Sequence, residues 1–157
     1  MNEADKRDEA DMSNSGLTDE ATQVAESVYL RLGGEQAIHL LVDRFYELMD
    51  TLPEAWAVRS LHPESLAGSA DKLFKYLSGW FGGPQLYINE RGHPRLRMRH
   101  APYAIGTSER DEWMLCMRLA LTEQVHDPVL YASVLRAFSD MADHMINADG
   151  RSACAAV

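Results

Sequence analysis

The sequence predicts an all-α fold built as a single domain. Apolar residues recur at the three-and-four spacing of one helical face in several segments. No run is convincing as a strand, since the nearest candidate, residues 86–88, is too short. A chain of 157 residues that is 46% hydrophobic can build one core and is too short for two full domains.

Capping and breaking residues place the first helices in order. Thr18 can cap a helix that ends at the glycine pair Gly33–Gly34. A second helix is expected over residues 35–50, where apolar side chains follow one face. A third is expected over residues 66–80, and the sequence Gly-Gly-Pro at 82–84 ends it.

The connections between these helices lack a helical period. The stretch through Pro53 and Pro63 is predicted to be irregular, and residues 85–92 are predicted to form a loop. A short helix should then have His100 in its last turn, because Ala101 precedes a proline and is disfavoured in helical conformation.

Two further helices complete the predicted fold. Ser108 with Asp111 forms a capping-box pattern at the start of one, and Asp127 followed by Pro128 is a typical start for the other. Their apolar faces consist of Trp113, Cys116, Met117, Ala120 and Leu121 in the first, and Leu130, Val134, Phe138, Met141 and Met145 in the second.

The two ends differ in composition from the predicted domain at residues 17–148. Residues 1–16 are acidic with few large apolar side chains, which predicts a disordered leader, and residues 149–157 predict a flexible tail. No apolar stretch is long enough for a membrane span, and no secretory signal is evident. Cys116 and Cys154 form no disulfide framework, so we expect a cytoplasmic protein without membrane partners.

Residues 91–106 form a basic segment that stands out in a chain of net charge -9. It contains four arginines and no acid: Arg91, Arg95, Arg97 and Arg99. Such a cationic island usually has an anionic partner. Nucleic acid fits poorly, because only Tyr103 could stack nearby and the remaining acidic surface would repel a polyanion. A small dianion fits better, and haem supplies one, since its propionates pair with guanidinium groups and its iron takes one histidine.

His100 is the candidate metal ligand, although this segment alone favours a locally hydrogen-bonded histidine. The histidines and cysteines lack the spacing of a zinc site. No Cys-x-x-Cys-His motif is present, so any haem would be held by coordination and packing alone.

Several motifs together resemble the group II truncated haemoglobins, which have a two-on-two helical sandwich around haem. The resemblance covers residues 28–145, and the basic block with the tryptophan after it is its most specific part. The motifs are GG at 33–34, RFY at 44–46, LAG at 66–68, GGP at 82–84, GHPRLRMRHAPY at 92–103 and ERDEWMLCM at 109–117.

The resemblance implies a haem b cofactor with His100 as proximal iron ligand. Arg99 and Lys72 match positions that pair with the propionates. Further haem contacts are implied for Tyr76, Leu77, Leu96, Tyr103, Ile105 and Met117.

On the distal side, where a gas would bind, Tyr46 and Trp113 match the family's hydrogen-bond donors. Without the resemblance, both would be interpreted as core aromatics. Leu73 matches an apolar wall position, and Ser69 stands where larger globins often carry a histidine. His62 departs from the tyrosine or phenylalanine usual in the family. It could donate to the ligand, release Tyr46 to do so, or pack with a local hydrogen bond, and direct coordination of iron is a further alternative.

The first hypothesis is reversible binding or transport of oxygen and other diatomic gases at a pentacoordinate ferrous haem. The alternative is redox catalysis at the same haem, either nitric oxide dioxygenation or peroxidase-like turnover. That chemistry needs an external reductase, because the chain lacks a glycine-rich nucleotide fingerprint. A third hypothesis is a haem-free helical regulator that docks through its acidic leader. Either a monomer or a homodimer is compatible with the sequence.

Overall fold

The computed structural model describes residues 26–148, and every regular element in this range is a helix. This confirms the predicted all-α class. No helix in this range is long and apolar enough to cross a membrane. The elements are α2 (Val28–Leu32), α3 (Gly34–Thr51), the 3-10 helix η1 (Pro53–Ala55), α4 (Trp56–Ser60), α5 (Ala67–Trp80), α6 (Leu86–Arg91), α7 (Leu96–His100), α8 (Thr107–Gln124) and α9 (Pro128–Met145).

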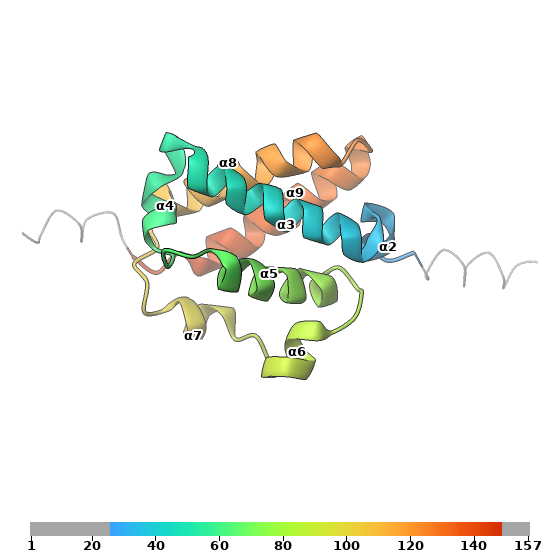
Figure 1. Cartoon of the computed structure of the whole chain (residues 1–157), viewed down its shortest axis with the longest axis horizontal. Helices are drawn as coiled ribbons and strands as arrows, with labels where there is room; N and C mark the ends of the chain where they lie inside the picture. The colour runs from blue at the N-terminus through green and yellow to red at the C-terminus, as the bar shows by residue number, and fades with distance from the viewer. Residues whose placement is uncertain (1–25, 149–157) are drawn as a thin grey trace, which may run out of the picture.

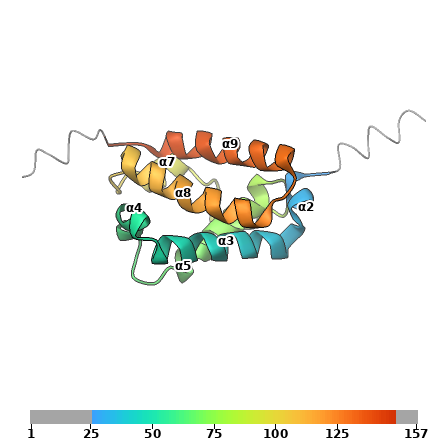
Figure 2. The same ribbon diagram turned by 90° about the horizontal axis from the view of Figure 1, so that it is seen from above.

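Four long helices form the frame, with α3 and α5 packed against α8 and α9 (Figures 1 and 2). Helix α3 contacts both α5 and α8, and α8 in turn contacts α9. The short helices α6 and α7 lie on the side of α5 away from α3, as Figure 1 shows, and α7 also contacts α9. This arrangement leaves α5 and α7 facing each other.

The core is an aromatic and aliphatic cluster between these layers, and Phe138 of α9 is fully buried within it. The Phe138 ring lies 5.1 Å from Trp80, 5.7 Å from Phe81 and 5.7 Å from Trp113, measured between ring centroids. Aromatic pairs at this separation add specific geometry to the burial of apolar area. One side chain therefore connects α5, α8 and α9.

The predicted helix boundaries are confirmed at several turns. Gly33 ends α2 with a φ of 116°, a left-handed conformation that glycine adopts without steric cost. Gly83 has a different role, because a Cβ there would lie 2.5 Å from the Tyr29 ring. The side chain of Asp127 accepts hydrogen bonds from the first N–H groups of α9, and Pro128 occupies its first turn.

The prediction of a loop at residues 85–92 was wrong, because these residues form α6. Tyr87 is buried and α6 packs on α5, so tertiary contacts stabilise a helix too short to show a period. The stretch through Pro53 and Pro63 was also predicted to be irregular, yet its first part forms η1 and α4. A proline in the first turn of a helix costs no hydrogen bond, which explains the helical start at Pro53.

The helix starts also differ from prediction at two places. Helix α8 begins after Gly106, whose N–H donates to Glu109 Oε2 at 2.9 Å, so the predicted box of Ser108 and Asp111 was wrong. Helix α2 begins after Ser27, which caps it. The predicted cap Thr18, the acidic leader, the tail and Cys154 lie outside the described residues.

Cys116 is a free, fully buried thiol in α8. Burial, with a smaller effect of the Glu112 carboxylate, raises the pKa of this thiol to about 11. The thiolate is the reactive form of cysteine, so Cys116 acts as a small apolar core residue.

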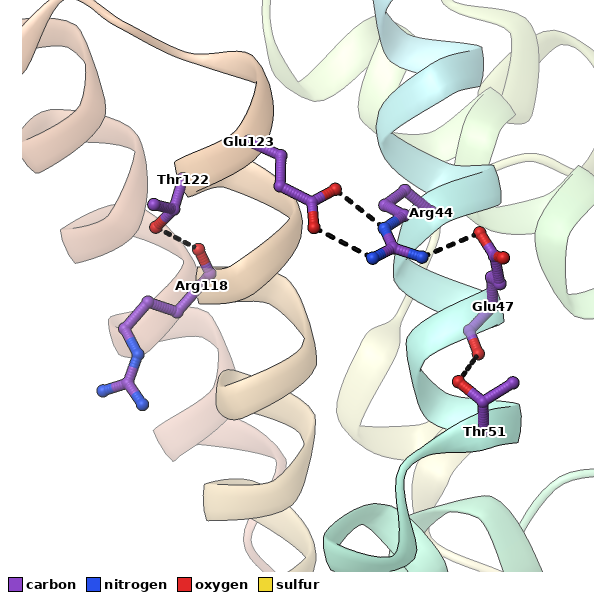
Figure 3. Close-up of polar contacts among 6 residues, drawn as sticks. All are labelled: Arg44, Glu47, Thr51, Arg118, Thr122 and Glu123. Carbon is purple, nitrogen blue, oxygen red and sulfur yellow. Dashed lines mark hydrogen bonds and ion pairs between the residues drawn. The ribbon is translucent and has the colours of Figure 1, made fainter.

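An ion pair on the outer surface connects α3 and α8 (Figure 3). Arg44 donates to Glu123 through Nε at 2.7 Å and Nη2 at 2.9 Å, and its Nη1 donates to Glu47 at 3.0 Å. This two-point contact is the strong geometry for a guanidinium and a carboxylate. The hydrogen bonds from Arg44 lower the pKa of the Glu123 carboxyl.

Replacement of the central core aromatic should be severely destabilising. We expect Phe138→Ala to lower the free energy of unfolding by about 3–5 kcal/mol, because the cavity it leaves borders three large rings that cannot collapse together. Val129→Ala on the same helix is the control, since Val129 is 73% exposed. Equilibrium urea unfolding measures both, and a similar change in the two variants would contradict a central role for Phe138.

The Arg44–Glu123 pair should stabilise the fold in a pH-dependent way. Because the Glu123 pKa is lowered in the folded state, the stabilisation is fully present above the ordinary value of 4.5 and is lost as the pH falls. Glu123→Gln should therefore lower Tm at neutral pH and match the wild type in acid. Glu54→Gln, an exposed carboxylate of η1, is the control. A Glu123→Gln difference that persists unchanged in acid would exclude this pair as its cause.

Candidate functional site

A cavity of about 510 Å³ lies between α5 and α7, and side chains from α3, α4, α6, α8 and α9 also line its walls. The structure brings together most of the predicted site residues around it. Those that line the cavity are Tyr46, His62, Ser69, Lys72, Leu73, Tyr76, Leu96, Arg99, His100, Tyr103, Ile105 and Trp113.

Two predicted contacts lie elsewhere. Leu77 and Met117 are fully buried in the core and are not part of the cavity wall. Each lies one helical turn beyond a residue that does line the cavity, Leu73 in α5 and Trp113 in α8. A further turn along each helix carries the side chain past the cavity and into the interface between the layers.

The sequence analysis missed several wall residues. Tyr87 lay in the predicted loop, whereas Met141 and Met145 had been assigned to the apolar face of the last helix. Arg91 belongs to the basic segment, which was the available signal for it. The missed residues are Val58, Leu61, Pro63, Tyr87, Arg91, Glu109, Arg110, Met141, Ala142 and Met145.

The imidazole of His100 is held by its own helix. Its Nδ1 lies 2.7 Å from the carbonyl oxygen of Leu96, one turn earlier in α7. A carbonyl oxygen only accepts, so Nδ1 carries the proton, and in the neutral ring Nε2 keeps its lone pair. An imidazole in this tautomer is the form that binds a metal through Nε2.

The segment that follows His100 is fixed by Asn147, just after α9. The Asn147 amide nitrogen donates to the carbonyl oxygens of His100 at 3.1 Å and Tyr103 at 2.9 Å. Its side-chain oxygen accepts from the Ile105 N–H at 2.9 Å. These bonds hold a non-helical stretch against the cavity.

His62 is also bound locally. Its Nδ1 donates to the Val58 carbonyl oxygen at 2.9 Å, and burial is the main cause that lowers its pKa, which favours the neutral ring. The supporting turn is itself held by α8, because the Glu112 carboxylate accepts from the Val58 N–H at 2.7 Å. The Nε2 of His62 is therefore an acceptor in this state.

Tyr46 of α3 and Trp113 of α8 both line the cavity. The Tyr46 ring meets His62 edge-on, with 5.9 Å between centroids, and both Tyr46 and Trp113 pack against Phe45. Burial raises the pKa of the Tyr46 hydroxyl, which therefore stays protonated and able to donate. An indole N–H can only donate.

Cations lie at the cavity alongside these apolar walls. The Arg99 guanidinium lies 5.7 Å from the centre of the Tyr87 ring, and Lys72 and Arg91 also line the cavity. Arg110 is already neutralised by Asp111 and Asp143. No cluster of three or more metal-binding side chains occurs in residues 26–148.

Comparison with known proteins identifies the family to which this fold belongs. The family described as bacterial-like globin matches residues 27–147. The group 2 truncated hemoglobin YjbI of Bacillus subtilis is 33% identical over 73% of this chain and 84% of its own length. Among solved structures, a group II 2-on-2 hemoglobin from Agrobacterium tumefaciens has a TM-score of 0.77 and 44% identity, covering 79% of this chain and 96% of that one. A cold-adapted truncated hemoglobin from Pseudoalteromonas haloplanktis has a TM-score of 0.76 and 39% identity, covering 78% and 98%.

The chain therefore belongs to the bacterial-like globin family, within its group II truncated haemoglobins, and has their two-on-two fold. It is a haem globin that binds gases. The cavity fits such a cofactor, because it combines largely apolar walls, two imidazoles whose Nε2 atoms are free, those of His100 and His62, and cations for two carboxylates.

Proposed function

We propose that the protein binds oxygen and other diatomic gases reversibly at a pentacoordinate haem b, with His100 as the proximal ligand. The observation that carries this proposal is the free Nε2 of His100, in a fixed tautomer, on the wall of the cavity. A haem b in the cavity would supply the ferrous iron that binds the gas. Every other part of the function falls to the chain's own side chains.

On the proximal side, the Leu96 carbonyl holds the ring of His100 and keeps the proton on Nδ1. Lys72 and Arg99, the pair expected from the sequence, are the cations available to the cofactor's carboxylates, and Arg91 lines the cavity beside them while its Nε lies 3.8 Å from Glu90. Apolar walls from Leu73 and Leu96 limit the access of water.

On the distal side, we assign Tyr46 and Trp113 as the donors to the bound gas. Both side chains line the cavity, and each carries a proton at neutral pH. His62 takes a supporting role, because its own proton is committed to Val58 and its Nε2 can only accept. The structure thus favours the local hydrogen bond among the alternatives for His62, with Tyr46 left to donate.

The ligand assignment is tested by the visible spectrum. We expect the purified protein to show a Soret band and a pentacoordinate ferrous spectrum, and His100→Gly to lose that spectrum and regain it when imidazole is added. His126→Gly, an exposed histidine between α8 and α9, should behave as the wild type. A six-coordinate low-spin wild-type spectrum that disappears in His62→Ala would overturn the proposal.

The donor assignment is tested by oxygen release after rapid mixing. Tyr46→Phe and Trp113→Phe should each speed release by about 10- to 100-fold, the factor that corresponds to a lost hydrogen bond of roughly 1.5–3 kcal/mol. His62→Leu should change the rate less than either. A His62→Leu effect as large as that of Tyr46→Phe would show that His62 itself donates.

A further inference from the structure

The four arginines of the basic segment divide between two hollows. Arg91 and Arg99 line the haem cavity, whereas Arg95 and Arg97 line a second groove of about 920 Å³. The proposed function uses the first pair only. Nothing in gas binding explains why two more guanidinium groups stand around a separate opening.

The groove lies between α5, α6, α7 and α9 and adjoins the haem cavity, because Tyr76, Tyr87, Leu96, Met141 and Met145 line both. Much of its lining is aromatic or apolar, including Tyr76, Trp80, Leu96, Met141 and Met145. Its volume lies within the range of roughly 300–1,000 Å³ typical of small-molecule sites. Methionine side chains adapt to ligands of irregular shape, so this lining suits a flexible hydrocarbon chain.

The charges at the groove favour a single negative head group. Neither Arg95 nor Arg97 forms an ion pair with a carboxylate of residues 26–148. Lys75 is already bound to Glu90 at 2.6 Å and to Asp71. One carboxylate, Asp140, opposes the two guanidinium groups from α9. Arg95, Arg97 and Asp140 together carry a net charge of +1 when the lining histidines, His93 and His144, are neutral.

We propose that this groove binds a long-chain fatty acid. The hydrocarbon chain lies along Trp80 and the methionines of α9, and the carboxylate is bound by Arg95 and Arg97. A guanidinium matches a carboxylate through two parallel hydrogen bonds, which selects the acid over a neutral lipid of equal length. The site is separate from the gas-binding cavity, although Tyr76, Leu96 and other residues contribute to both walls.

The test is calorimetric titration of the haem-loaded protein with myristate below its micellar concentration. We expect one site in the wild type and a Kd raised about tenfold or more in Arg95→Gln/Arg97→Gln, because a charged pair is lost. Ala137→Phe should block binding, since Ala137 lines the groove, and Asp140→Asn should tighten it by removing a repulsion. Arg118→Gln is the matched control, as Arg118 is an exposed arginine of α8 outside both hollows.

Circular dichroism, Tm and the Soret band of each variant separate this result from loss of fold or haem. An unchanged Kd in the double arginine variant would overturn the proposal. Equal binding of 1-tetradecanol would overturn recognition of the carboxylate. Displacement of haem by myristate, together with an equal loss of binding in Arg99→Gln, would place the acid in the haem cavity instead. Binding to phosphatidylglycerol vesicles without binding of free myristate would assign the groove to a membrane surface and also overturn it.

Discussion

The contact between Trp113 and Phe138 is the constraint on which the rest of this structure depends. Phe138 joins α9 to α5 through Trp80, and Trp113 joins α8 to α3 through Phe45. Trp113 also lines the cavity, so the same ring packs against the core and forms part of the cavity wall. Packing of the core therefore fixes the position of a side chain that we propose as a donor to the bound gas, since dense interiors leave little room for adjustment.

The long helices could be predicted because each buries one continuous face, as Ile38, Leu41 and Phe45 do in α3. Helices α4 and α6 could not, because each is too short for a period and is stabilised by partners distant in sequence. Glu112 caps α4 from α8, and burial of Tyr87 secures α6 against α5. Such partners become visible only when the chain is folded.

The candidate site could likewise be predicted from the sequence only in part. The basic segment singled out His100, family resemblance implied its role and those of Tyr46 and Trp113, and all three line one cavity. The resemblance could not show where the side-chain protons lie. That depends on two backbone carbonyls, of Leu96 and Val58, each one turn before its histidine. The two histidines of the cavity thus have the same local geometry, and their different roles arise from the walls on which they stand.

The Asn147 side chain shows that the folded domain extends beyond the last residue of α9. Its three hydrogen bonds reach the chain around His100, Tyr103 and Ile105, although it lies beyond the last residue of α9. The segment that lines the cavity after His100 is therefore held by a residue outside the helices of residues 26–148. A fusion junction or protease site introduced directly after Met145 would spare every helix of residues 26–148 and still release the loop that follows His100, the proposed haem ligand.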